Sequence, residues 1–270
     1  MTQNLERSPS TLSSSTDLQT YIEDLLTIDE TNSTGIFNYG RIATADELNL
    51  NSNSTIINYD DALIFSNNSM NINVKDYLIN YAGATGTGLW SRYDINIAGY
   101  ETDTSVETLA NLGGTIESYA GDISIDGGEV INSRVSIPTQ VITTYGTQGG
   151  RTSGYYYDHK VYSINGELTR EATIYAGNNL TFNTLYFNNN GSEIYALNDI
   201  AINATNNFEN TSYYLYAGVW EHYNCKDWYC ATGGTWNTYR SEGGSWGYIS
   251  ERTTKTENIL YHQLFKLVEM

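Results

Sequence analysis

Aromatic side chains are the residues of this sequence best suited to molecular recognition. The chain has 270 residues with 5 Trp and 24 Tyr, and four of the five Trp lie between positions 213 and 254. Exposed Trp and Tyr stack on sugars or fill pockets at protein interfaces with little loss of rotamer entropy. The alternative, left open by the sequence, is that they cap a core or pair across strands. The candidate binding residues are Tyr155, Tyr156, Tyr157, Trp220, Tyr223, Trp228, Tyr229, Trp236, Tyr239, Trp246 and Tyr248.

The two cysteines, Cys225 and Cys230, lie among these aromatic residues. Their short separation favours a local disulfide over two free thiols, and a disulfide indicates a location outside the cytoplasm. With His222 they could also supply three zinc ligands, but the spacing is irregular and no fourth ligand is evident. We therefore predict a disulfide, and neither a metal nor another cofactor.

Catalytic motifs are absent from the sequence. The three histidines, His159, His222 and His262, are scattered, and there is no His-Glu-x-x-His, no Gly-x-Ser-x-Gly and no phosphate-binding loop. We predict no enzymatic activity. A glycan-processing enzyme with a pair of carboxylates is the weaker alternative. Its candidates are Asp122 and Asp126, which flank an expected strand, and the adjacent Asp60 and Asp61, which would point to opposite faces of a strand.

The composition excludes several partners. Asp and Glu number 31 against 13 Lys and Arg, which gives a net charge of −18. Such a surface repels a phosphate backbone, so we expect no nucleic-acid partner. No apolar run approaches the length of about 18 residues that a membrane-spanning helix needs. Residues 1–16 lack the apolar core of a secretory signal and are predicted to form a flexible leader.

The elements that must position the aromatic residues are mostly strands. One short helix is predicted over residues 17–30, because the apolar residues from Leu18 to Ile28 form a single stripe. From Ile36 onward, apolar residues alternate in short runs separated by Asn, Gly and Asp, which is typical of many short strands.

A repeat of about 20 residues organises these strands. Residues 174–182 (IYAGNNLTF) align with residues 194–202 (IYALNDIAI), and both have apolar residues at relative positions 0, 6 and 8. The same frame fits residues 42–50 and, with one inserted residue, 116–125. Each copy is followed by an apolar residue and an asparagine: Ile57 and Asn58, Ile131 and Asn132, Phe187 and Asn188, Phe208 and Asn210.

One repeat is too thin to bury its own apolar face, whereas stacked repeats pair in parallel and bury a continuous core. We therefore predict an all-β fold, a parallel β-helix, with Asn side chains stacked in ladders at its turns. Most of these asparagines are expected to serve the structure and not a ligand.

Two regions interrupt the repeat. A hairpin insertion is predicted at 133–173, with strands at 135–145 and 155–164, and Asn165-Gly166 predicts a second tight turn that leads into residues 167–174. Residues 213–254 predict an aromatic-rich β-meander with turns at two Gly-Gly pairs. The predicted order is a leader (1–16), a short helix (17–30), a β-helix with its insertion (31–212), the meander (213–254) and a terminal strand or tail (255–270).

Three segments resemble the repeats of filamentous haemagglutinin, which also build the exoproteins of contact-dependent growth inhibition. They are IYAGNNLTF (174–182), GSEIYALNDIAINA (191–204) and FENT (208–211). The resemblance extends over about 170–212, is weaker over 36–72 and 109–132, and does not include the interruptions. It implies a right-handed parallel β-helix that belongs to a longer filament. It also implies two-partner secretion through an outer-membrane transporter to the bacterial cell surface.

In growth inhibition exoproteins, a region in the middle of the filament, where insertions interrupt the repeats, binds the target cell. The resemblance therefore implies a receptor-binding module of a toxin-delivering adhesin. Its partner would be an outer-membrane protein or a surface glycan on target bacteria or host cells. A purely structural stalk segment of an adhesin filament is the main alternative.

Overall fold

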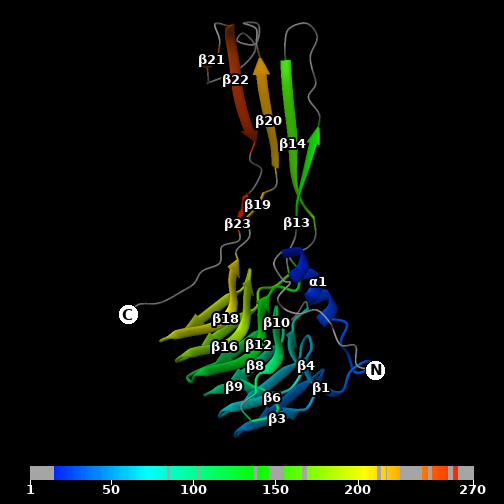
Figure 1. Cartoon of the computed structure of the whole chain (residues 1–270), viewed down its shortest axis with the longest axis vertical. Coiled ribbons are helices and arrows are strands. Elements are labelled where there is room, and N and C mark those ends of the chain that lie inside the picture. Colours follow the sequence, from blue (N-terminus) through cyan, green and yellow to red (C-terminus); the bar gives the residue numbers. More distant parts are fainter. Residues whose placement is uncertain are drawn as a thin grey trace. The chain divides into compact units, whose positions relative to one another are not determined.

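The computed structural model describes residues 15–83, 86–102, 104–136, 139–145, 155–165, 169–211, 214–216, 218–225, 239–242, 245–254 and 258–260. For the strands within 139–165 and beyond residue 211 the description concerns chiefly the backbone. The chain forms two compact units. The solenoid unit contains the residues up to 137 and residues 167–213, and the antiparallel unit contains residues 138–166 and 214–261 (Figure 1).

Each turn of the solenoid unit contains three strand segments, and from β12 (Ile123–Ser133) onward the last segment of one turn and the first of the next form a single long strand. The first turn consists of β1 (Gly35–Asn38), β2 (Arg41–Thr44) and β3 (Leu48–Ser52). The later short strands are β4 (Thr55–Asn58), β5 (Leu63–Ser66), β6 (Met70–Val74), β7 (Tyr77–Tyr81), β8 (Gly88–Ser91), β9 (Ile95–Ala98), β10 (Val106–Leu112), β11 (Thr115–Ser118), β15 (Thr173–Ala176) and β17 (Glu193–Ala196). Three strands are longer: β12 (Ile123–Ser133), β16 (Leu180–Asn190) and β18 (Ile200–Thr211).

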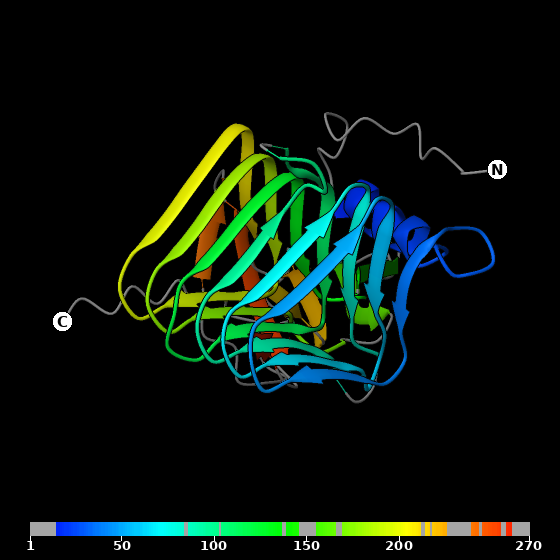
Figure 2. The same ribbon diagram turned by 90° about the horizontal axis from the view of Figure 1, so that it is seen from below.

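These strands form two sheets in which every pairing between named strands is parallel. The six-stranded sheet has the order β17-β15-β11-β8-β5-β2. The ten-stranded sheet has a first arm (β1, β4, β7, β10) and a second arm (β3, β6, β9), and the long strands belong to both arms. For example, β12 pairs with β9 through residues 123–125 and with β10 through residues 127–133. The solenoid unit is therefore an all-β, solenoid-like stack of parallel strands, and Figure 2 shows its turns side by side in sequence order.

The predicted repeat frame is confirmed by the strand register. Ile174 lies opposite Ile194, Leu180 opposite Ile200 and Phe182 opposite Ile202. Side chains at relative positions 0, 6 and 8 point inward and build one continuous apolar core. Two further turns, at 64–72 and 89–97, follow the same frame and were missed in the sequence. They carry Ser66 and Ser91 where the copies at 174–182 and 194–202 have alanine, and these buried hydroxyls donate to backbone carbonyls at the corner.

A ladder of asparagines runs along the inside of the solenoid unit. Seven side chains take part, and each except the last donates Nδ2 to Oδ1 of the asparagine in the next turn over 2.7–3.0 Å: Asn38, Asn58, Asn80, Asn111, Asn132, Asn189 and Asn210. The predicted ladder is thus confirmed, with one correction. Asn189 and not Asn188 is the member, because Asn132 pairs with Asn189 in the register between β12 and β16. Asn188 donates to Glu209 instead.

Helix α1 (Ser15–Leu25) packs on the outer face of the first arm. Leu18, Tyr21, Ile22 and Leu25 are buried against apolar residues of successive strands, including Ile57, Ile79, Ala110 and Ile131. The apolar stripe is thus confirmed, but the predicted end at residue 30 is wrong. The helix stops at Leu25 because the next turn tightens: the amide of Thr27 and its hydroxyl both donate to the carbonyl of Asp24, three residues back.

A carboxyl group is buried beneath this helix. Glu129 is 2% exposed and pairs with Thr108, whose hydroxyl lies 3.2 Å from the Tyr21 hydroxyl. Burial raises the pKa of Glu129 to about 7, and a hydrogen bond from Tyr21 opposes part of that rise. Its Oε2 has no hydrogen-bond partner among the described residues. The site therefore favours the protonated, neutral carboxyl group.

Candidate functional site

The antiparallel unit is built from both interruptions of the repeat. The first interruption supplies β13 (Thr139–Tyr145) and β14 (Tyr155–Asn165), and the second supplies β20 (Gly218–Cys225), β21 (Tyr239–Glu242) and β22 (Ser245–Thr254). They form one five-stranded sheet in the order β13-β14-β20-β22-β21, and all of its pairings are antiparallel. A short pair, β19 (Tyr214–Tyr216) with β23 (Asn258–Leu260), belongs to the same unit.

This topology corrects two predictions. β14 has β20 as its second neighbour, and the described residues 169–174 do not pair with β14 as the expected turn at Asn165-Gly166 would require. Residues 173–176 pair in parallel with β11 and β17 in the solenoid unit. The second interruption is not a simple meander either, because β22 lies between β20 and β21. The pairs β14–β20 and β20–β22 both join strands that are far apart in the sequence, so local turn residues could not predict them.

The register brings most of the candidate aromatic positions together. Tyr157 lies opposite Tyr223, and Tyr155 is in line with Cys225, Tyr248 and Tyr239 across four strands. Residues directly opposite in an antiparallel pair share a face, and alternate residues of one strand also share it. Six candidate positions therefore fall on one face of the sheet: Tyr155, Tyr157, Tyr223, Tyr239, Trp246 and Tyr248.

The remaining candidates are placed differently. Tyr156 and Trp220 take positions on the opposite face, opposite Asn224 and Lys160 respectively. Trp228, Tyr229, Trp236 and Cys230 lie outside the described residues, so the disulfide of Cys225 with Cys230 stays a prediction. His222 and Cys225 are three residues apart on β20, which places them on opposite faces and separates two of the zinc ligands that the sequence suggested.

The candidate carboxylates all lie in the solenoid unit. Asp122 accepts hydrogen bonds from Asn178 Nδ2 and from the backbone and side chain of Asn179, at 2.6–3.1 Å, and so holds a turn. Asp60 and Asp61 lie in the turn after β4 and not on a strand, and Asp61 has a φ of 64°. Among the described residues, no cluster of His, Cys, Asp and Glu could hold a metal ion.

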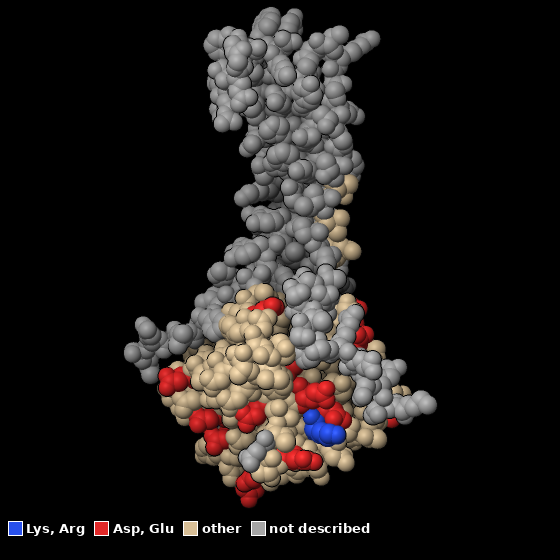
Figure 3. Space-filling view, viewed as in Figure 1, with Lys and Arg blue, Asp and Glu red and all other residues tan. Residues whose placement is uncertain are grey.

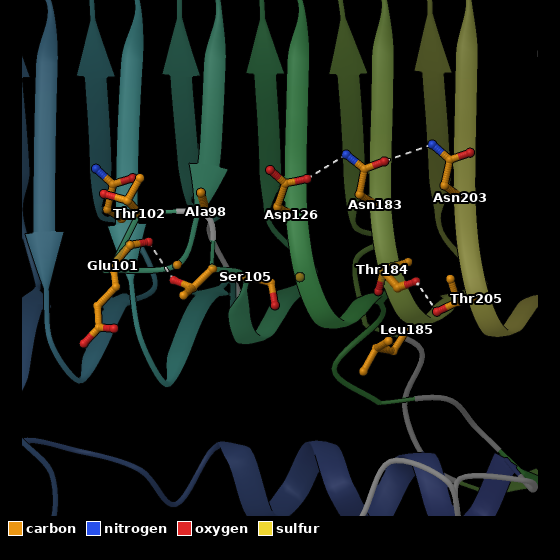
Figure 4. A pocket seen from close by; sticks show the side chains of 14 residues that line it. Ala98, Glu101, Thr102, Ser105, Asp126, Asn183, Thr184, Leu185, Asn203 and Thr205 are labelled. Atoms are coloured by element: carbon orange, nitrogen blue, oxygen red, sulfur yellow. Dashed lines mark hydrogen bonds between the residues drawn. The ribbon is translucent and has the colours of Figure 1, made fainter.

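Asp126 lies in a polar groove on the outside of the solenoid unit. The groove has a volume of about 800 Å³ and follows a row of residues at equivalent positions of successive strands: Asn73, Ala98, Asp126, Asn183 and Asn203. Figure 4 shows Asp126, Asn183 and Asn203 in line, joined by hydrogen bonds of 2.7 Å and 2.9 Å. Other lining residues are Thr184, Leu185 and Thr205.

A loop between β9 and β10 borders this groove. Gly99, Glu101, Thr102, Thr104 and Ser105 of the loop line it. The loop is closed by hydrogen bonds from the Gly99 amide to the Thr104 carbonyl and from the Thr104 hydroxyl to the Glu101 carbonyl. This groove was not predicted from the sequence. Its only signal was spacing: Tyr77 pairs with Thr108, a step of 31 residues (108 − 77), whereas Thr108 pairs with Glu129 after 21 (129 − 108).

Comparisons of the chain with protein-family models, with curated proteins and with solved structures found no match. The class is therefore defined by the structure itself, as an all-β protein in which a parallel solenoid unit is interrupted twice to build an antiparallel unit. Within the part of the chain that the structure describes, no helix has the length and apolar character needed to cross a membrane.

Proposed function

We propose that this protein is a cell-surface binding module, in which the antiparallel unit recognises a receptor protein or a glycan on another cell. The observation that carries the proposal is the shared sheet. Two interruptions that are far apart in the sequence pair through β14 and β20, so that both contribute to one surface. A purely structural stalk would need neither interruption, because the solenoid core is continuous from Ile56 to Ile194 without them.

The distribution of aromatic positions supports the same proposal. Six of the candidate Tyr and Trp positions fall on one face of the five-stranded sheet. Tyr and Trp are enriched among the residues that dominate binding energy at interfaces. A concentration of them on one face is therefore suited to a partner with apolar pockets or sugar rings.

The acidic surface of the protein disfavours a polyanionic partner. Acidic side chains are spread over the face of the solenoid unit seen in Figure 3, where basic side chains are few. With a net charge of −18 for the chain, a nucleic acid would be repelled. The proposed receptor is therefore a protein or a neutral glycan.

The proposed setting is an exported bacterial filament of the filamentous haemagglutinin type, with an outer-membrane transporter as the secretion partner. In that setting the solenoid unit is a right-handed parallel β-helix, and the chain is a receptor-binding region of a contact-dependent growth inhibition exoprotein. The repeat with apolar residues at positions 0, 6 and 8, now seen as stacked turns, supports this setting. We propose no catalytic role for the chain.

Cell binding tests the proposal. We expect the fluorescently labelled full chain to bind saturably to at least one member of a panel of Gram-negative bacteria and epithelial cells. Replacing Trp246 or Tyr248 by Ala should weaken this binding by about tenfold or more, as for hot-spot aromatic residues. Matched controls are Trp90→Ala and Tyr119→Ala, since these solenoid aromatics are 42% and 72% exposed. Absence of saturable binding to every cell type would support the stalk instead.

A further inference from the structure

The polar groove contains a break in a row of hydrogen-bonded side chains. On one side of Ala98, Asn73 donates to Asn51 over 2.8 Å. On the other side, Asn203 donates to Asn183, and Asn183 donates to Asp126. These residues occupy equivalent positions in successive turns, so a polar side chain at position 98 would join the two halves of the row. Ala98 has no hydrogen-bonding side chain, so the row is broken at this one position, which we call the rung at Ala98.

Both sides of the gap present hydrogen-bond acceptors. Asn73 uses Nδ2 to bond Asn51, which leaves its carbonyl oxygen Oδ1 as the atom that an amide in the next turn would bond. Asp126 accepts from Asn183 at Oδ1, and its carboxylate has a second oxygen. A group that fills this rung must therefore donate in both directions along the row. A sugar ring with two neighbouring hydroxyl groups can do so.

The rest of the groove offers the same chemistry over a greater length. Five turns contribute to the row, so it extends over about 19 Å at a spacing of about 4.8 Å between neighbouring strands. Amide and hydroxyl groups of Asn183, Asn203 and Thr205 can both donate and accept. Leu185, which is 48% exposed, provides an apolar surface of the kind on which the C–H face of a sugar can pack.

The charge of the groove favours neutral over anionic sugar chains. The described residues that line the groove include the carboxylates of Asp126 and Glu101 and no Lys, Arg or His. An anionic sugar chain would be repelled by these carboxylates. A neutral chain would keep its hydroxyl donors close to the acceptors at no such penalty.

We propose that this groove binds a neutral, linear oligosaccharide, with one hydroxyl-bearing ring over Ala98. The site lies wholly within the solenoid unit. It is therefore separate from the receptor-binding face proposed for the antiparallel unit, and it does not depend on that proposal.

Isothermal titration of the full chain tests the site. The probes are maltohexaose, cellohexaose and chitohexaose as neutral chains, and hexagalacturonate as an anionic chain. We expect saturable binding of at least one neutral hexasaccharide and none of hexagalacturonate. No binding of any neutral probe overturns the proposal.

One substitution locates the site without removing a structural group. Ala98→Asn fills the broken rung with the residue type found in the neighbouring turns, and should weaken binding at least tenfold while the melting temperature is kept or raised. Ala201→Asn is the matched control, since Ala201 is exposed on β18 outside the groove lining. Wild-type affinity in Ala98→Asn would overturn the assignment of the site.

A third variant separates this proposal from the proposed function. Trp246→Ala, which should impair cell binding, is expected to bind the hexasaccharide with wild-type affinity. A loss of oligosaccharide affinity in Trp246→Ala would move the site to the antiparallel unit and would contradict the groove assignment.

Discussion

At the scale of single residues, buried asparagines link neighbouring turns of the solenoid unit through side-chain hydrogen bonds. Asn111 shows why they matter: it is 0% exposed, accepts from Asn80, and donates to Asn132 and to the Thr173 carbonyl. Each asparagine thus satisfies polar groups in two neighbouring turns. The repeat in the sequence could not show whether Asn188 or Asn189 joins the ladder. The answer depends on the register between β12 and β16, in which Glu129 pairs with Tyr186, 57 residues further along the chain (186 − 129).

Removal of one ladder member should be strongly destabilising. We expect Asn111→Ala to lower the free energy of unfolding by roughly 2–3 kcal/mol, because buried donors and acceptors lose their partners. Urea unfolding measures the change. The control is Asn71→Ala in the outer row of Asn49, Asn71 and Asn96, where water replaces the lost bonds and the loss should stay below about 0.5 kcal/mol. Equal losses in both variants would contradict the account of the ladder.

Glu129 should make the stability of the solenoid unit depend on pH. Its pKa of about 7 in the folded protein exceeds its ordinary value of 4.5, so the folded state holds a proton that the unfolded state releases between these values. The stability that protonated Glu129 contributes to the folded state is therefore fully present below about pH 4.5, and it is lost as the pH rises to about 7. The full loss corresponds to roughly 3 kcal/mol.

Glu129→Gln tests this dependence, because glutamine has a similar shape and no titrating proton. We expect the variant to gain stability relative to the wild type as the pH rises from 5 to 8, measured by thermal unfolding. The control is Glu23→Gln, an exposed position of helix α1, and this variant should follow the wild-type profile. Parallel profiles for Glu129→Gln and the wild type would rule out a raised pKa.

At the scale of elements, periodic patterns were informative and turn signals only in part: Glu242 lies opposite Ser245, as the predicted turn at Gly243-Gly244 requires, whereas the turn predicted at Asn165-Gly166 did not give the neighbour of β14. The apolar stripe of α1 and the 0, 6 and 8 frame are local, so the sequence shows them directly. The end of α1 and the neighbours of β14 depend on other contacts. The hydrogen bonds of Thr27 end the helix, and β14 pairs with β20 more than 50 residues further along the chain, as in Tyr157 opposite Tyr223.

The packing of α1 on the first arm should contribute substantially to stability. Ile22 is 0% exposed and belongs to the core between helix and sheet. We expect Ile22→Ala to lower the free energy of unfolding by about 2–4 kcal/mol, since it removes buried methyl groups and leaves a cavity. Urea unfolding compares it with Glu23→Ala on the exposed side of α1, which should change stability by less than about 0.5 kcal/mol. A negligible effect of Ile22→Ala would show that α1 is dispensable.

At the scale of the whole molecule, the sequence separated the repeat from its interruptions but gave no sign that the interruptions join. Composition placed the candidate aromatic residues in two segments, and the pairing of β14 with β20 unites them. The groove was also hidden, because Ala98 is an inconspicuous residue whose importance lies in its neighbours, Asn73 and Asp126, in adjacent turns. Both sites arise from long-range register, which a single sequence does not display.

The central claim is that both interruptions form one binding surface, and the cell-binding affinity of two facing variants tests it most directly. Tyr157 comes from the first interruption and Tyr223 from the second, and they lie opposite each other. We predict that Tyr157→Ala and Tyr223→Ala each weaken binding about tenfold. We also predict that the double variant loses less than the product of the two effects, because neighbouring residues couple. Wild-type affinity in either single variant, or independent effects in the double variant, would contradict a shared surface.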